Sequence, residues 1–202
     1  MIEIPQTIRG RVITEHKASY VVVADNQEYV ASIRGHFHDE ENKRFPKVGD
    51  YVVMSVLEEE KAVIESIEER TSEVVRKSAH DDTIQVMVAN VDYVFIVMGL
   101  DDDFNLRRLE RYLVLTEQAH ITPVVILNKL DVIDDIALYM RQSKEVAKDV
   151  DVYAVSALTG EGMEVFAEYM KDGATGVLLG SSGAGKSTIT NYVLKEVLQD
   201  TK

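Results

Sequence analysis

The sequence lacks cysteine and tryptophan, and its 202 residues include only three prolines. Without cysteine, this chain can form neither a disulfide nor a thiolate zinc site, which favours a reducing compartment. It has no run of about 18 apolar residues, the length that a membrane span needs, and its start lacks the pattern of a signal peptide. Composition therefore predicts a soluble, cytoplasmic protein.

Positive charge is scarce overall but not at the start of the chain. The formal net charge is −13, yet residues 1–47 contain seven basic and seven acidic residues, so residues 48–202 carry the whole excess. An acidic total argues against general nucleic-acid binding and places any RNA-facing surface early in the chain. The candidate phosphate contacts there are Arg9, Arg11, Lys17, Arg34, Lys43, Arg44 and Lys47. The alternative is a solvated, charge-balanced surface.

Five short segments near the start alternate apolar and polar residues and are rich in β-branched side chains. They are residues 7–14, 18–24, 27–34, 50–58 and 61–68. This period of two predicts strands, and their number and spacing predict an OB-like barrel over residues 1–70. Such barrels often bind RNA or single strands. A barrel that serves only as a spacer stays possible, because a fold alone does not define a function.

Residues 71–88 are polar, show no strong period and predict a linker. From residue 89 to residue 202, apolar strands alternate with helical patterns. The expected strands are 91–99, 122–128, 150–156 and 175–180, and the expected helices are 104–119, 134–148, 162–171 and 186–199. This alternation predicts an α/β fold in which a parallel sheet has helices on both faces.

The segment GSSGAGKST matches the phosphate-loop pattern Gly-x-x-x-x-Gly-Lys-Ser, with a strand before it and a helix after it. Its residues are Gly180, Ser181, Ser182, Gly183, Ala184, Gly185, Lys186, Ser187 and Thr188. The glycines allow backbone N–H groups to surround phosphate oxygens at the positive end of the helix. We expect Lys186 to reach the β- and γ-phosphates and stabilise transition-state charge, and Ser187 to bind Mg²⁺. A purely structural turn would not require the Lys–Ser pair.

The tetrapeptide Asn128-Lys129-Leu130-Asp131 follows a predicted strand, so it lies at the sheet edge where open α/β folds bind ligands. The carboxylate of Asp131 can accept hydrogen bonds from guanine N1–H and the exocyclic amine, a donor pair that adenine lacks. Asn128 would secure the loop, and the Lys129 stem would lie over the ring. Taken alone, the tetrapeptide could be an ordinary turn before a capped helix.

Ser156, Ala157 and Leu158 follow the next strand at the same edge. The backbone N–H near Ala157 would donate to guanine O6, an acceptor that adenine lacks. Three matches after three consecutive strands favour GTP and GDP as ligands. An ATP-dependent enzyme would require the match at 128–131 to be accidental. In ordinary GTPases the phosphate loop comes first, whereas here it follows both guanine loops, so we expect a circularly permuted domain.

With these loops and the stretches IRGHF (33–37), ANVDYVFIV (89–97) and FNLRRLERYL (104–113), the chain resembles the ribosome-small-subunit-dependent GTPases of the RsgA or YjeQ family. The resemblance runs from about Thr7 to the last residue. It implies a cytoplasmic bacterial GTPase that binds the 30S subunit and its 16S rRNA during late assembly. It also implies that the ribosome stimulates hydrolysis.

The sequence departs from that family in its last part. Sixteen residues follow Lys186, and no aspartate is followed by a glycine three positions later, so the switch I and switch II patterns are missing. The family's zinc domain is missing too, and zinc is expected only there. A fragment is the favoured interpretation, in which the complete protein hydrolyses GTP and this chain is a poor catalyst. The alternative is a natural switch-less protein that acts as a nucleotide-gated rRNA-binding module without significant hydrolysis.

Three consecutive aspartates are interpreted as part of a helix start and not as a metal site. Asp101, Asp102 and Asp103 precede a predicted helix, and three consecutive side chains cannot all point one way. We therefore expect Asp103 to cap the helix. Arg108 is expected to lie on a solvated helix face.

Overall fold

The structure is a computed structural model that describes residues 7–17, 19–35, 37, 45–58, 60–77 and 84–200. The chain divides into two compact units, residues 1–91 and residues 92–202. None of the helices in the described part of the chain combines the length and apolar character that crossing a membrane requires.

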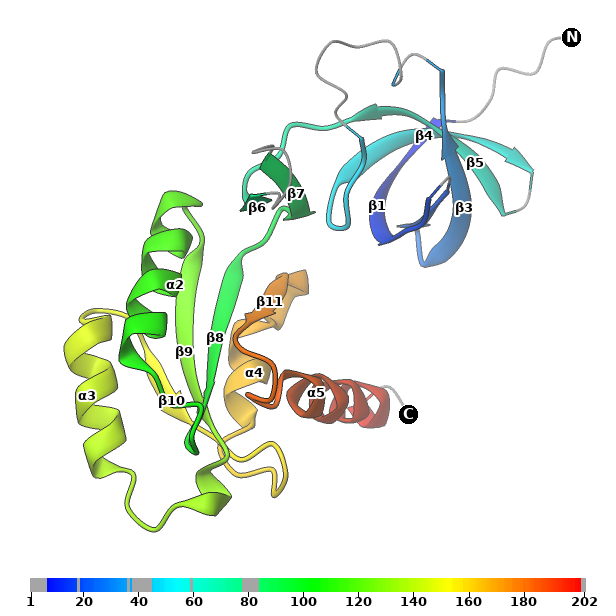
Figure 1. The fold of residues 1–202 in the computed structure, drawn as a ribbon. Helices are drawn as coiled ribbons and strands as arrows, with labels where there is room; N and C mark the ends of the chain where they lie inside the picture. The colour runs from blue at the N-terminus through cyan, green and yellow to red at the C-terminus, as the bar shows by residue number, and fades with distance from the viewer. Residues whose placement is uncertain are drawn as a thin grey trace, which may run out of the picture. The chain divides into compact units, whose positions relative to one another are not determined.

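The first unit contains a closed five-stranded barrel (Figure 1). Its strands are β1 (Thr7–Glu15), β2 (Tyr20–Ala24), β3 (Gln27–Ile33), β4 (Tyr51–Glu58) and β5 (Lys61–Ile67). They pair in the order β1-β2-β3-β5-β4, and β4 returns to β1. β3 and β5 pair in parallel, and the other pairings are antiparallel. The predicted OB-like barrel is therefore confirmed.

The barrel closes around the inward-facing residues of each strand. Val12, Val22, Met54 and Ile64 are fully buried in one cluster, because every second residue of a strand points to the same side. The two-residue turn between β2 and β3 has positive φ at both Asp25 and Asn26, as the hairpin turn that matches strand twist requires. The alternating pattern in the sequence therefore reflects one apolar and one solvated face.

A buried ion pair joins the barrel to the segment that follows it. The side chains of Asp50 and Arg70 are 0% and 3% exposed, and both guanidinium–carboxylate distances are 2.7 Å. Arg70 also donates to the carbonyl of Phe45 and to the carboxylate of Glu73. The first residue of the following hairpin is thus tied to the barrel.

The stretch expected to be a linker, residues 71–88, contains two paired strands. β6 (Glu73–Lys77) and β7 (Ile84–Ala89) form an antiparallel hairpin, and the first compact unit extends to Val91. The pairing register shifts between Val74 and Val75. Val75 and Met87 are apolar although they are 48% and 50% exposed, so the hairpin lacks the apolar–polar alternation by which strands are recognised in a sequence.

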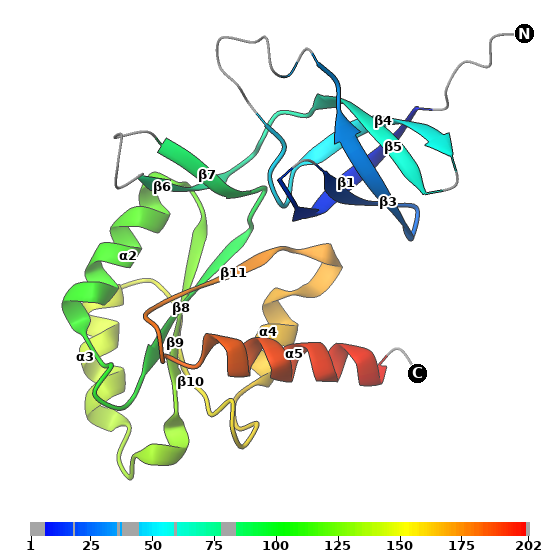
Figure 2. The same ribbon diagram turned by 45° about the vertical axis from the view of Figure 1, so that its right-hand side comes forward.

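The second unit is a four-stranded parallel sheet between two layers of helices (Figures 1 and 2). The strands are β8 (Tyr93–Gly99), β9 (Thr122–Asn128), β10 (Val152–Ala154) and β11 (Gly176–Leu179), in the order β10-β9-β8-β11. Helices α2 (Leu106–Gln118) and α3 (Ala137–Ala147) cover one face, and α4 (Glu164–Tyr169) and α5 (Lys186–Asp200) cover the other. Short 3₁₀ turns span Leu130–Val132 and Lys171–Gly173. The predicted α/β fold is confirmed.

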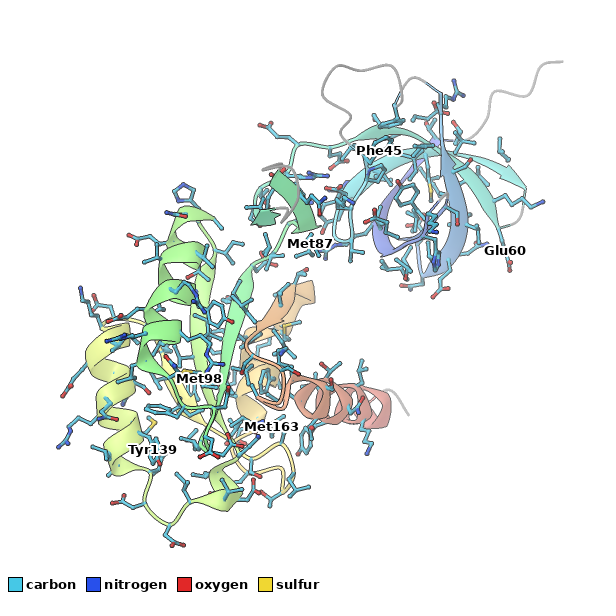
Figure 3. All side chains as sticks on the ribbon, in the orientation of Figure 1. Phe45, Glu60, Met87, Met98, Tyr139 and Met163 are labelled. Atoms are coloured by element: carbon cyan, nitrogen blue, oxygen red, sulfur yellow. The ribbon has the colours of Figure 1, made fainter. Side chains whose placement is uncertain are left out.

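Both faces of this sheet are apolar. Along β8, Phe95 and Val97 pack in the cluster that includes residues of α4 and α5, while Ile96 and Met98 are buried on the opposite face. Figure 3 labels Met98 and also Met163, which packs in the same cluster as Phe95. Because the four strands are parallel, the loops after residues 99, 128, 154 and 179 all leave the sheet at one edge.

Candidate functional site

The phosphate loop connects β11 to α5, which begins at Lys186. Gly183 and Gly185 have φ values of +90° and +93°, which side-chain-bearing residues rarely adopt. A Cβ at Gly180 would overlap with the carbonyl oxygen of Val97. The three glycines of the motif are therefore required by backbone conformation or by close packing.

The predicted phosphate and metal residues lie at the start of α5. Lys186 Nζ donates to the carbonyl oxygens of Gly180, at 2.9 Å, and Ser181, at 2.5 Å, so its charge lies within the loop. Ser187 and Thr188 are exposed in the first turn, and Ala184 and Ile189 anchor the loop and helix in the core. A helix amino terminus carries partial positive charge, which suits an anion.

Asn128 joins three loops through one buried side chain that is 2% exposed. Its Nδ2 donates to the carbonyl oxygen of Ala184 in the phosphate loop, at 3.0 Å. Its Oδ1 accepts from the backbone N–H of Ala157, at 3.1 Å. The phosphate loop and both predicted base loops are thus held together by one amide group.

Asp131 is oriented by the loop that follows β10. The buried Ser156 hydroxyl donates to Asp131 Oδ1 at 2.5 Å and accepts from the N–H of Thr159 at 3.1 Å. The N–H of Leu130 donates to the carbonyl of Val155. A carboxylate offers about four acceptor positions, so the bond from Ser156 leaves Asp131 able to accept further hydrogen bonds.

The loop predicted to bind guanine O6 packs against α5. Its Ala157 N–H donates to Asn128, so donation to O6 would require this N–H to exchange its partner. Leu158 is 78% exposed. Gly160 has φ +88°, and a Cβ there would lie 2.9 Å from the hydroxyl of Tyr192 in α5. Glycine is therefore needed for both the backbone angle and the contact with the helix.

Asp103 does not cap α2, so that prediction is wrong. The cap is Asn105, whose Oδ1 accepts from the N–H of Arg108 at 3.0 Å. Asp103 Oδ1 accepts from Ser181 Oγ and from Arg108 Nη1, at 2.5 and 2.7 Å, and Oδ2 accepts from the N–H of Gly99. Burial acts to raise the pKa of Asp103, but these hydrogen bonds outweigh it and lower the pKa below its ordinary value. Arg108 is accordingly a partner of this carboxylate, with 19% of its side chain exposed, and not part of a solvated face.

Lys129 has an unpredicted partner in the same loop as Asp103. Its backbone is left-handed, with φ 70° and ψ 41°, and its Nζ lies 2.5 Å from Asp101 Oδ2. The hydrogen bond from Lys129 lowers the pKa of Asp101. Both aspartates lie in the loop after β8, at the same sheet edge as the three motifs, and this position is the sequence signal that could have identified them.

The candidate RNA contacts that the structure describes are distributed over the barrel. Among the described candidates, ion pairs join Arg9 to Glu68, Arg34 to Glu65 and Lys47 to Glu15, at 2.6–2.8 Å. Arg11 donates to the carbonyl oxygens of Gly49 and Asn90, and Lys17 is exposed. Lys43 and Arg44 lie outside the described residues.

The fold and the site define a class of protein. A loop with the phosphate-loop pattern that follows both predicted base loops in chain order, with Asn128 joining all three, is the arrangement of a circularly permuted P-loop domain of the GTPase type. The family model described as RsgA GTPase matches residues 67–202. The chain belongs to this family, and the predicted family is confirmed.

Individual relatives agree with this assignment. The chain is 38% identical over 193 residues to the small ribosomal subunit biogenesis GTPase RsgA 1 of Listeria monocytogenes, covering 95% of this chain and 54% of that protein. It is 38% identical over 204 residues to RsgA of Opitutus terrae, covering 95% and 56%. The chain thus spans about half the length of these relatives.

Two solved structures have the same fold. The crystal structure of YjeQ from Thermotoga maritima matches with a TM-score of 0.78 at 27% identity, covering 93% of this chain and 65% of that one. The crystal structure of YloQ, described as a circularly permuted GTPase, matches with a TM-score of 0.70 at 27% identity, covering 92% and 64%. The permuted order of the motifs in this chain therefore agrees with the description of the YloQ structure.

The contact between Gly185 and Asn128 can be tested by stability. A Cβ at Gly185 would overlap with Asn128 Nδ2, whereas a Cβ at Gly183 would meet no atom within 4 Å, and both residues have φ near +90°. Gly183→Ala should cost about 1–3 kcal/mol through backbone strain. Gly185→Ala should cost about 1–3 kcal/mol more, because Asn128 must move. Hydrogen exchange of β8 and β9 amides measures both, and equal losses would contradict the packing described.

Proposed function

We propose that this chain binds GTP and GDP and forms the nucleotide-binding and rRNA-binding part of a GTPase that acts in late assembly of the 30S ribosomal subunit. The observation that carries the proposal is the Asn128 side chain, which joins the phosphate loop to the loops predicted to read the base. A phosphate loop alone would suit any nucleoside triphosphate. Its direct connection to a carboxylate-bearing loop favours guanine.

Guanine recognition is assigned to Asp131. Guanine presents N1–H and an amine side by side, and a carboxylate can accept from both. The hydroxyl of Ser156 holds Oδ1 of Asp131, so Ser156 contributes by orienting the acceptor. Lys129 would cover the ring with its aliphatic stem, and the loop at Ala157 and Leu158 would close the far side of the base.

The phosphates are assigned to the loop from Gly180 to Thr188. Its N–H groups, with the positive end of α5, would surround the phosphate oxygens. Lys186 would turn from the loop carbonyls to the β- and γ-phosphates and stabilise the charge that develops during transfer. Mg²⁺ would be held by Ser187, whose exposed position in the first turn fits this role, and would neutralise phosphate charge.

The ribosomal role rests on the relatives and on the barrel. Relatives from several bacteria are named small ribosomal subunit biogenesis GTPases, which supports action on the 30S subunit in the cytoplasm. The barrel would contact 16S rRNA through its basic residues. The ion pair of Arg9 with Glu68 is partly exposed, at 58% and 36%, and exposed pairs contribute little. A phosphate could therefore replace such a carboxylate at small cost.

Base specificity tests the assignment of Asp131. Xanthine carries a carbonyl where guanine carries the amine. The side-chain amide of the Asp131→Asn variant should therefore accept a hydrogen bond from N1–H and donate one to that carbonyl. We expect the affinity for GDP to fall at least about a hundredfold, and xanthosine diphosphate to become the better ligand. Asp134→Asn, an exposed change of the same charge nearby, should alter affinity by no more than about twofold. An unchanged base preference in Asp131→Asn would count against the assignment.

Ribosome dependence tests the activity. The complete protein that contains this chain should release phosphate from GTP faster when purified 30S subunits are added, and 50S subunits serve as the control. Turnover that 30S subunits leave unchanged would contradict the proposal. GDP and 30S binding without phosphate release would instead favour a nucleotide-gated rRNA-binding module.

A further inference from the structure

The loop after β8 lies beside the predicted nucleotide loops but belongs to none of their motifs. Parallel pairing of β8 with both β9 and β11 places this loop between the base-reading loop and the phosphate loop at one sheet edge. Two of its side chains, Asp101 and Asp103, reach outward to those neighbours. Its third acidic residue, Asp102, is exposed.

Asp103 fixes the beginning of the phosphate loop. Its Oδ1 accepts from the hydroxyl of Ser181, and the carbonyl of Ser181 accepts from Lys186. Ser181 is therefore held through its side chain by one group and through its backbone by another. This residue is the second of the loop, where the chain leaves β11 and must turn its N–H groups inward.

Arg108 holds the carboxylate of Asp103 in place. Its guanidinium donates to Asp103 Oδ1 at 2.7 Å and to the Asp103 backbone carbonyl at 2.9 Å. The two side chains are only 19% and 16% exposed, so water screens the pair less than it would on an open surface. The charge of Asp103 is thus balanced before any phosphate arrives.

Asp101 contacts the base-reading loop after β9, as Asp103 contacts the phosphate loop after β11. Its Oδ2 accepts from Lys129, and its Oδ1 accepts from the N–H of Asp103. A Cβ at Gly99 would lie 2.5 Å from Asp101 Oδ1, so glycine leaves room for this carboxylate. The side chains of Lys129 and Asp101 are 29% and 39% exposed, so this ion pair is weaker than the contacts of Asp103.

We propose that Asp101 and Asp103 are positioning residues of the nucleotide site, with Asp103 holding the phosphate loop through Ser181 and Asp101 holding Lys129 for the base. The inference rests on the proposed guanine-nucleotide function and adds a fourth loop to the site. A loop that is already ordered loses less conformational freedom when its ligand binds, which increases affinity. The two aspartates act on different parts of the ligand, so their effects separate.

The test compares three changes of equal charge in one loop: Asp101→Asn, Asp102→Asn and Asp103→Asn. The affinities of the full chain for GDP and GMP are measured by competition against a fluorescent GDP. Asp103→Asn should weaken GDP binding about tenfold and GMP binding less, since the β-phosphate depends on the loop. Asp101→Asn should weaken both by the same factor, up to about fivefold. Asp102→Asn should stay within about twofold of the unaltered chain.

Ser181→Ala provides a second test that leaves the Asp103–Arg108 pair intact. If Asp103 acts through the Ser181 hydroxyl, the double variant should bind GDP no more than about twofold worse than Asp103→Asn alone. Independent, multiplying losses in the double variant would overturn the inference. The inference would also be overturned if the GDP affinities of Asp103→Asn and Ser181→Ala matched that of Asp102→Asn. Tighter binding of GDP by Asp101→Asn would overturn it too. If the unaltered chain does not bind GDP, the proposed function fails as well. If the unaltered chain binds GDP but the variants do not behave as expected, this inference alone fails.

Discussion

The side chain of Asn128 hydrogen-bonds to two loops that come from different strands, and it lies at the end of a third. A primary amide suits this position because it has a donor and an acceptor on opposite sides. Either one left without a partner in this buried position would cost about 1–3 kcal/mol. The Ala184 carbonyl, the Ala157 N–H and the space left by Gly185 are therefore mutually dependent.

The sheet makes this contact possible. Parallel strands end at one edge, so β9, β10 and β11 deliver their loops to the same place although 56 residues separate Asn128 from Ala184. The buried apolar residues on both sheet faces fix the strands in register, and this register sets the relative positions of the loops that follow the strands. Circular permutation changes the order of the motifs in the chain and leaves this edge intact.

Sequence patterns predicted the barrel and the parallel sheet, because alternation and apolar strands report burial directly. Motif residues at fixed spacing after those strands predicted the three loops. They did not predict the β6–β7 hairpin, where the exposed positions of Val75 and Met87 carry apolar side chains. They also gave Asp103 the role of a helix cap that Asn105 fills. A side chain that reaches Ser181, 78 residues away, depends on the fold and has no local pattern. The partners of the basic barrel residues were unpredictable for the same reason.

The central claim is that the loops joined by Asn128 form one guanine-specific site. Its most direct test is the binding of GDP and of ADP to this chain in the presence of Mg²⁺, measured by calorimetry. The two ligands share their ribose and phosphates, so any difference reports the base. We predict that GDP binds at least about a hundredfold more tightly. Equal affinities would show that the phosphate loop works without the base loops and would contradict the account.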